Sequence, residues 1–322
     1  MQSAPAAQPP NARRVVDRAP ELVGILNVTA DSFYDGGRYL DPPRAVRHGL
    51  DLFAAGASWV DVGGMSTRPG SEEIPEEEEI SRVEPVIAGL VGSLRSNHET
   101  RAASFESRAA SSLPADGHGE MRHCVSVDTY RAKVAESALA AGASCINDVS
   151  GFGLDPAMCE FAASADCPVV INHMQGTPQT MQVSPSYDNL WDELLRFFES
   201  RLARFLKAGG RESNAMIDPG IGFGKTLGHN LEILRGLARL HQLGRPVFLG
   251  CSRKSFISDL NPQSLPAGRR GAIRNPQSPK DRLPGSLAAA AWAALSRVQF
   301  LRVHDVAETT QFLKVFLAIA SD

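Results

Sequence analysis

Short runs of mostly apolar residues recur along the chain, and polar side chains or glycines gather toward their C-terminal ends. Their interiors are close to continuously apolar, without the alternation of a half-exposed strand. Such runs are typical of parallel strands that are covered on both faces. We therefore predict eight strands, at residues 22–29, 59–64, 124–129, 145–150, 169–174, 215–219, 247–252 and 300–305.

Amphipathic segments separate most of these runs. In the segment 190–207, large apolar residues recur at helical spacing, and Gly209 and Gly210 supply a stop signal. Strands that alternate with helices predict an α/β fold with a parallel sheet. Eight such units favour a single-domain (β/α)8 barrel, and a doubly wound sheet is the alternative.

Three stretches do not follow this rhythm. Residues 1–20 are rich in Ala and Pro and lack an apolar core, which indicates a disordered leader rather than a signal peptide. The barrel would occupy residues 21–322, with flexible insertions at about 93–121 and 261–284, where Ser, Ala, Arg, Gly and Pro prevail. Four glutamates, Glu76 to Glu79, follow Pro75 and fit the first turn of a helix, so we assign them no chemistry.

Composition narrows the class of protein. The chain has 322 residues and a formal net charge of -3, without the basic excess of a nucleic-acid-binding protein. No apolar run approaches the length of a membrane-spanning helix, so we expect no membrane association. The five cysteines form no CxxC pair, which indicates reduced core thiols in a cytoplasmic protein.

The stretch from Ile217 to Lys225 shows how one of these strands ends. A carboxylate, Asp218, is followed by a proline and three glycines, which suits a loop that passes close to a ligand. It is not a P-loop, because Pro219 stands where the first glycine is required, and Lys225 replaces the third glycine of a Rossmann fingerprint.

In a (β/α)8 barrel, the C-terminal ends of all strands meet at one mouth. Acceptors among these side chains suit a flat heterocycle with an amidine-like edge, whereas the cations suit a phosphate or carboxylate. Asn27 offers a hard oxygen for Mg²⁺. The set comprises Asn27, Asp61, Asp128, Asn147, Asn172, His173, Asp218, Ser252 to Ser255, Arg302 and His304, with Arg68 from the loop after the second strand.

Several of these runs resemble dihydropteroate synthase, an enzyme family of folate biosynthesis. The similar runs are GILNVTADSFYDGG (24–37), DVGGMSTRPG (61–70), SVDT (126–129), INDV (146–149), HMQGTPQTMQ (173–182), DPGIGFGK (218–225), GCSRKS (250–255) and RVHD (302–305). They follow one another in family order. Only the leader and the two insertions lie outside the resemblance.

The resemblance implies a (β/α)8 barrel and a homodimer. Its activity would be the condensation of 4-aminobenzoate with 6-hydroxymethyl-7,8-dihydropterin diphosphate, with Mg²⁺, to give 7,8-dihydropteroate and diphosphate. Asp128, Asn147, Asp218 and Lys254 would bind the pterin, Asn27 the magnesium, and Arg68, Arg302 and His304 the diphosphate. Phe33, Thr67, Pro69, Phe223 and Ser255 would form the aminobenzoate pocket. The catalytic group would be Lys254, Arg68, Arg302 and His304.

Two other functions remain open at this point. A pterin-dependent methyltransferase would share the barrel but would have no use for the cations. A non-catalytic paralogue that binds pterin is the other possibility, because Met65 stands where the family has glutamate and Ala30 where it has proline. Both departures lie in or beside the loops that would cover the mouth.

We predict that Met65→Glu lowers the KM for aminobenzoate, because the restored carboxylate would give Arg68 or a loop amide a partner. Steady-state kinetics of the two proteins at saturating pterin substrate measure this. A KM unchanged by the substitution would remove the idea.

Overall fold

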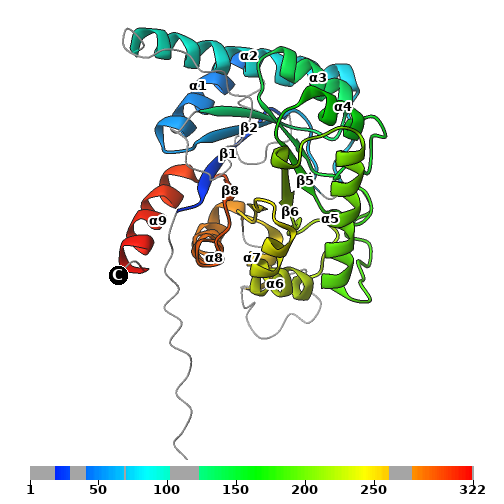
Figure 1. Ribbon diagram of the computed structural model, residues 1–322. Coiled ribbons are helices and arrows are strands. Elements are labelled where there is room, and N and C mark those ends of the chain that lie inside the picture. The colour runs from blue at the N-terminus through cyan, green and yellow to red at the C-terminus, as the bar shows by residue number, and fades with distance from the viewer. Residues whose placement is uncertain (1–18, 30–40, 69, 102–122, 261–277, 321–322) are drawn as a thin grey trace, which may run out of the picture.

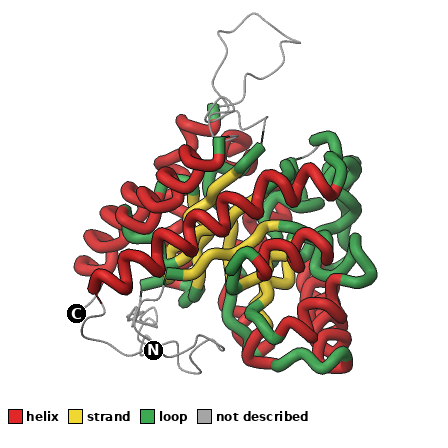
Figure 2. The backbone as a smooth tube through the Cα atoms, turned by 90° about the horizontal axis from the view of Figure 1, so that it is seen from above, coloured by secondary structure: helices red, strands yellow, loops and turns green. Residues whose placement is uncertain are grey.

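The chain folds into a parallel barrel surrounded by helices (Figures 1 and 2). The computed structural model describes residues 19–29, 41–68, 70–101, 123–260 and 278–320. Its strands are β1 (Glu21–Asn27), β2 (Trp59–Gly63), β3 (Cys124–Asp128), β4 (Cys145–Asp148), β5 (Val169–Asn172), β6 (Ala215–Asp218), β7 (Phe248–Gly250) and β8 (Phe300–Val303). The helices are α1 (Pro42–Ala54), α2 (Glu76–Arg101), α3 (Ala132–Ala140), α4 (Met158–Ala165), α5 (Leu190–Lys207), α6 (Leu227–Arg235), α7 (Ser255–Leu260), α8 (Leu283–Leu295) and α9 (Val306–Ala320). Short 3-10 helices cover Glu212–Asn214, Leu237–Leu243 and Pro279–Arg282.

The strand order confirms the predicted (β/α)8 barrel. The strands follow the order β6-β5-β4-β3-β2-β1-β8-β7, and each neighbouring pair is parallel. One parallel bridge between Ile217 and Val247 joins β6 to β7 across the remaining gap. All eight predicted strands are present, and most end one or two residues earlier than predicted. Their last polar residues belong to the loops at the mouth.

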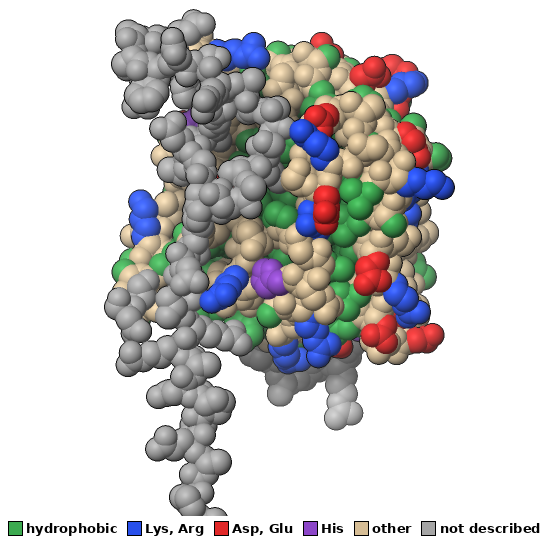
Figure 3. All heavy atoms as spheres, viewed as in Figure 1, with side chains coloured by type: hydrophobic (Ala, Val, Ile, Leu, Met, Phe, Trp, Pro, Cys, Tyr) green, Lys and Arg blue, Asp and Glu red, His purple; other side chains and the backbone are tan. Residues whose placement is uncertain are grey.

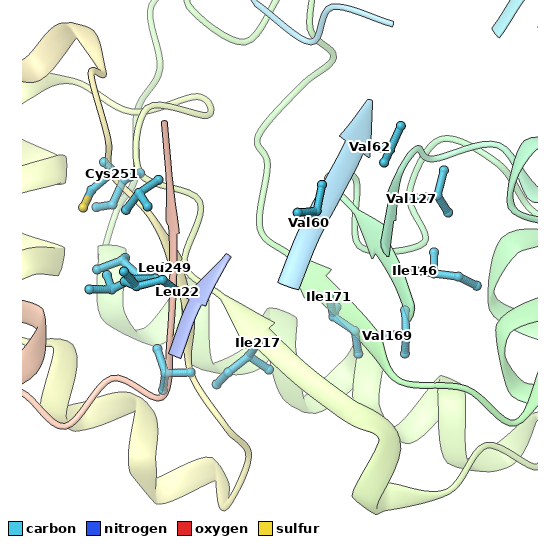
Figure 4. Close-up of a cluster of buried hydrophobic side chains, with 14 of the residues drawn as sticks. Leu22, Val60, Val62, Val127, Ile146, Val169, Ile171, Ile217, Leu249 and Cys251 are labelled. Atoms are coloured by element: carbon cyan, nitrogen blue, oxygen red, sulfur yellow. The ribbon is translucent and has the colours of Figure 1, made fainter. Parts of the chain in front are cut away.

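The pleat of the strands divides the buried side chains into two sets. Val60, Ile171 and Ile217 belong to the large apolar cluster outside the barrel, which packs against the helices (Figure 4). A second cluster lies inside the barrel and contains Val23, Trp59, Cys145, Val170, Met216, Phe248 and Phe300. Because side chains alternate along a strand, the residue two positions after each interior one also faces the interior. These residues include Asp61, Asn147, Asn172, Asp218 and Arg302.

The helices that cover the barrel follow the sequence pattern closely. Helix α5 has the bounds predicted for it, and the side chain of Asn189 accepts a hydrogen bond from the backbone N–H of Asp192 at its N-terminus. Glutamates occupy the first turn of α2, as predicted. In the described ranges, no helix combines the length and the apolar character that crossing a membrane requires. On the face seen in Figure 3, positive and negative side chains are interspersed.

The structure corrects the bounds of the two predicted insertions. Helix α2 continues to Arg101, so residues 93–101 extend a helix rather than begin a loop. Residues 279–282 form a 3-10 helix and α8 starts at Leu283, so the second insertion ends before Pro279. Helical order in these flanks contributes backbone hydrogen bonds that composition does not reveal. The parts at 102–122 and 261–277, and residues 1–18 of the predicted leader, lie outside the described residues.

Candidate active site

A buried carboxylate, Asp61, organises the polar layer of the barrel. It is 0% exposed and accepts hydrogen bonds from Ser126 Oγ (2.6 Å), Asn147 Nδ2 (2.9 Å) and Arg302 Nε (2.6 Å). Arg302 also donates from Nη2 to Asp128 Oδ2 at 2.6 Å. One guanidinium therefore lies between two carboxylates from different strands, and its position at the centre of the mouth is fixed.

Asp128 has an open acceptor atom. Its Oδ2 is occupied by Arg302, whereas its buried Oδ1 has no hydrogen-bond partner among the described residues. Burial raises the pKa of Asp128 to about 7; the positive charge of Arg302 opposes this shift, and the negative charge of Asp61 adds to it. A buried acceptor without a donor is unfavourable in a folded protein, so Oδ1 is poised to accept a hydrogen bond from a ligand.

Asp218 and Lys254 form the second charged part of the site. Asp218 accepts hydrogen bonds from the backbone N–H groups of Gly220 (2.7 Å) and Gly250 (3.3 Å). Burial raises the pKa of Asp218, and Lys254 opposes this shift. Lys254 donates to the carbonyl of Ile221, and its Nζ lies 4.3 Å from the centroid of the Phe223 ring. Burial lowers the pKa of Lys254 to about 8, and the charge of Asp218 opposes this shift.

The glycine-rich loop after β6 passes against the end of β5. Gly220 has a φ of +69°, and a Cβ on it would lie 1.9 Å from the carbonyl oxygen of His173. Only glycine fits there, which explains the sequence that follows Asp218. The loop does pass very close to a neighbouring segment, but that segment is the protein's own backbone, and the predicted approach of the loop to a ligand stays a prediction.

His304 and Arg68 complete the predicted anion-binding set, which also includes Arg302. The backbone N–H of His304 donates a hydrogen bond to Ser252 Oγ at 3.2 Å, and the same hydroxyl lies 3.1 Å from His304 Nδ1. Burial lowers the pKa of His304 well below its usual value, and the charges of Arg253, Arg302, Arg68 and Lys254 add to this shift. The positive charges of these residues thus all act on His304, and a neutral imidazole avoids further repulsion with them. Arg68 itself is exposed.

The structure describes part of the predicted aminobenzoate pocket. Thr67 is half-buried, Ser255 is exposed at the start of α7, and Phe223 is half-buried against Lys254. Phe33, Pro69 and Ala30 lie outside the described residues. Met65 is buried in a small apolar cluster with Tyr130 and Val149, and Phe223 packs against this cluster. A carboxylate at position 65 would therefore be desolvated, and it would lie in the cluster against which Phe223 packs.

Asn27, the predicted magnesium ligand, lies at the end of β1 beside Asp128. A Cβ added to Gly63 would lie 3.5 Å from Asp128 Oδ2 and 3.6 Å from Asn27 Oδ1, so both oxygens border the same glycine. Among the described residues, no group of three or more His, Cys, Asp or Glu side chains is placed to hold a metal ion. An amide oxygen beside a carboxylate fits Mg²⁺, which keeps several water or phosphate ligands.

Three features of the site escaped the sequence prediction. Asp61 was expected at a strand end, but its role as the partner of Asn147 and Arg302 was not. Glu79 is buried and forms an ion pair with Arg131, so it does more than begin a helix. Lys225 and His173 are both buried, and their side chains meet at 2.9 Å. The period-two pattern of the strands could have revealed the first feature, whereas the other two pairs join distant segments.

Comparison with known proteins gives the family. The family model described as pterin binding enzyme matches residues 23–101 and 106–304. The chain is 39% identical over 302 residues to dihydropteroate synthase of Escherichia coli strain K12, which covers 94% of this chain and 92% of the relative. Among solved structures, Xanthomonas albilineans dihydropteroate synthase with 4-aminobenzoic acid has a TM-score of 0.75 at 37% identity, covering 95% of each chain. The same enzyme in complex with 7,8-dihydropteroate has a TM-score of 0.73 at 36% identity, again covering 95% of each chain.

These matches extend over nearly the whole barrel, including every described strand end that carries a predicted site residue. The chain therefore belongs to the pterin-binding enzyme family, in its dihydropteroate synthase branch.

Proposed function

We propose that the protein condenses 4-aminobenzoate with 6-hydroxymethyl-7,8-dihydropterin diphosphate to form 7,8-dihydropteroate and diphosphate. The observation that carries this proposal is the open Oδ1 of Asp128 inside a buried polar layer, in a chain whose relatives are dihydropteroate synthases. A pterin presents amino and ring N–H donors along one edge. A buried carboxylate oxygen that lacks a donor would accept hydrogen bonds from such an edge.

The pterin would lie on the carboxylate side of the mouth. Asp128 and Asp218 would accept from its donor edge, Asn147 would add an amide, and Lys254 would donate to its acceptor atoms. Arg302 lies between Asp61 and Asp128, so its position is set before a ligand arrives. Preorganised partners of this kind reduce the cost of ordering the site on binding.

The diphosphate would lie toward Arg68, Arg302 and His304, whose surroundings are positive. The carbon–oxygen bond to the diphosphate breaks with its electron pair leaving on oxygen, and the positive charge that develops on the exocyclic carbon is delocalised into the electron-rich pterin. The amino nitrogen of aminobenzoate then forms the new carbon–nitrogen bond and loses a proton to solvent. Arg68, Arg302, His304 and Lys254 are the catalytic residues, because they stabilise the leaving group and the bound pterin.

Mg²⁺ is part of this proposal. Asn27 would hold it, beside Asp128, and the ion would neutralise charge on the leaving diphosphate. The aminobenzoate ring would lie against Phe223, with Thr67 and Ser255 near its carboxylate; Phe33 and Pro69, which lie outside the described residues, would complete the pocket. The described residues of this pocket are partly exposed, which suits a second substrate that enters after the pterin.

Diphosphate release by the purified protein tests the activity. We expect release that requires the pterin substrate, aminobenzoate and Mg²⁺, and a loss of at least about a hundredfold in Asp218→Ala, because the pterin loses a buried charged partner. Asp51→Ala, an exposed aspartate on α1, is the matched control and should retain full activity. Asn27→Ala should raise the Mg²⁺ concentration needed for half-maximal rate.

Two other results would redirect the assignment. Tight pterin binding without diphosphate release would indicate a non-catalytic pterin-binding paralogue. Methyl transfer from a methylated pterin to a corrinoid acceptor would indicate the methyltransferase.

The pH dependence of pterin binding follows from Asp128. Its pKa of about 7 in the free protein means that it carries a proton at lower pH, whereas the donor edge of a pterin requires the ionised form. We therefore expect the Kd to weaken about tenfold for each pH unit below 7 and to level off above it. Calorimetric titration between pH 5.5 and 8.5 measures this, and Asp128→Asn should give a weaker Kd without that slope. An equal slope in wild type and variant would contradict the assignment.

We also propose that the protein forms a homodimer in the cytoplasm. Helices α8 and α9 contact each other and carry exposed apolar side chains: Trp292 is 38% exposed, Val315 56% and Ile319 79%. Val315 and Ile319 are four residues apart and share one face of α9, and exposed apolar side chains of this kind are typical of an interface. All five cysteines are free thiols, which fits a reducing compartment.

Charge on this face should separate the subunits. We expect the double variant Val315→Lys and Ile319→Lys to sediment as a monomer, because burying two ammonium groups is unfavourable. Leu206→Lys, at a 44% exposed apolar position on α5, should leave the dimer intact. Sedimentation equilibrium distinguishes the two masses, and a monomeric wild type would refute the dimer.

A further inference from the structure

The loop after β6, residues 219–224, is held by side chains from other segments. Three of its glycines have positive φ angles, so its backbone has little conformational preference of its own. Its carbonyl groups nevertheless accept hydrogen bonds in succession. Gly220 O accepts from the backbone N–H of Phe223 (3.0 Å) within the loop. The next four carbonyls accept from side chains: Ile221 O from Lys254 Nζ, Gly222 O from Gln182 Nε2 (2.6 Å), Phe223 O from Lys225 Nζ (3.0 Å) and Gly224 O from Tyr187 Oη (2.8 Å).

Lys225 is the unusual donor in this set. It is 3% exposed, and among the described residues no carboxylate forms an ion pair with it. Its Nζ instead lies 2.9 Å from His173 Nδ1, 3.0 Å from Phe223 O and 3.3 Å from His173 O. These three acceptors match the three protons of an ammonium group, although burial lowers the pKa of Lys225 well below its usual value, with the charge of Lys254 adding to this shift and that of Asp218 opposing it. Burying a lysine without an ion pair is costly, and an apolar side chain would fill the same space.

The hydrogen-bond partners of Lys225 belong to the loop and to the end of β5. Its partner His173 packs edge-on against Phe197 of α5, with ring centroids 4.7 Å apart, and lies 6.0 Å from the ring of Tyr187. Lys225 therefore lies between the barrel wall and α5, behind the loop. Lys254 contacts the same loop from the site side, with its Nζ 4.3 Å from the centre of Phe223. Phe223 is thus contacted by two lysines: Lys225 donates to its backbone carbonyl, and Lys254 lies over its ring.

We propose that Lys225 is a positioning residue that fixes Phe223 as the wall of the aminobenzoate pocket. This inference rests on the proposed function of the site. Lys225 holds the carbonyl of Phe223 itself, whereas the pterin-binding Asp218 is held by the backbone N–H groups of Gly220 and Gly250. Loss of Lys225 should therefore disturb the arylamine pocket much more than the pterin pocket.

Lys225→Met separates these two pockets by measurement. We expect the KM for aminobenzoate to rise about tenfold, the value for one lost charge-assisted hydrogen bond, while kcat and the Kd for the pterin substrate stay within about twofold. Tyr187→Phe, which removes the donor to Gly224 and keeps the ring, should change the KM in the same direction by a smaller factor. Lys133→Met is the matched control, because Lys133 is exposed on α3 and should show no change.

Hydrogen exchange adds a readout that does not depend on turnover. The amides from Gly222 to Lys225 should exchange faster in Lys225→Met and Tyr187→Phe, with strand amides unchanged. An active enzyme whose aminobenzoate KM is unaffected in both variants would overturn the inference. So would a KM and a pterin Kd that worsen together with a lower Tm, because that pattern indicates a general packing role. If Lys225→Met does not fold, Tyr187→Phe decides. A wild type without synthase activity would instead refute the proposed function.

Discussion

The contact of Arg302 with Asp61 and Asp128 is the interaction on which the rest of the site depends. One cation shared by two buried carboxylates leaves an excess negative charge in a region of low dielectric constant. Burial raises the pKa of Asp128 and the negative charge of Asp61 adds to this shift, while the geometry leaves one oxygen of Asp128 open. A single guanidinium therefore determines where the barrel can accept a donor-rich ligand, and its removal would leave two buried charges uncompensated.

The barrel supplies this arrangement through the pleat of its strands. Interior positions hold an apolar layer with Trp59, Met216 and Phe300, and the next interior positions, two residues on, hold Asp61, Asp218 and Arg302. The apolar layer excludes water from below the polar one, which strengthens each charged contact above it. The same strands thus supply an apolar packing layer and, two residues further on, the polar layer of the site, so a change in one layer affects the other.

The fold could be predicted from the sequence because parallel strands that are covered on both faces are mostly apolar, and each of the eight runs has that character. The residues at the mouth of the barrel could be predicted as well, because they occupy the C-terminal ends of those strands. Contacts between distant segments did not: Arg302 and Asp61 are 241 residues apart, and Lys225 and His173 are 52 apart. Composition also failed at residues 93–101: serine and arginine there suggested a flexible insertion, yet α2 continues through them, because helix propensity is only a weak guide to structure.

The distribution of charge across the mouth gives the proposed reaction its direction. Asp128, Asn147 and Asp218 come from β3, β4 and β6, whereas His304 and the cations that act on it come from β8 and from the loops after β2 and β7. A pterin diphosphate has donors at one end and negative charge at the other, so it can satisfy both sides in only one orientation. That orientation places the bond to be broken between the two sides, where the cations stabilise the leaving group and the carboxylates stabilise the charge left on the pterin. In the proposed reaction, the carboxylates and cations at the mouth would therefore serve both recognition and catalysis, without a covalent nucleophile.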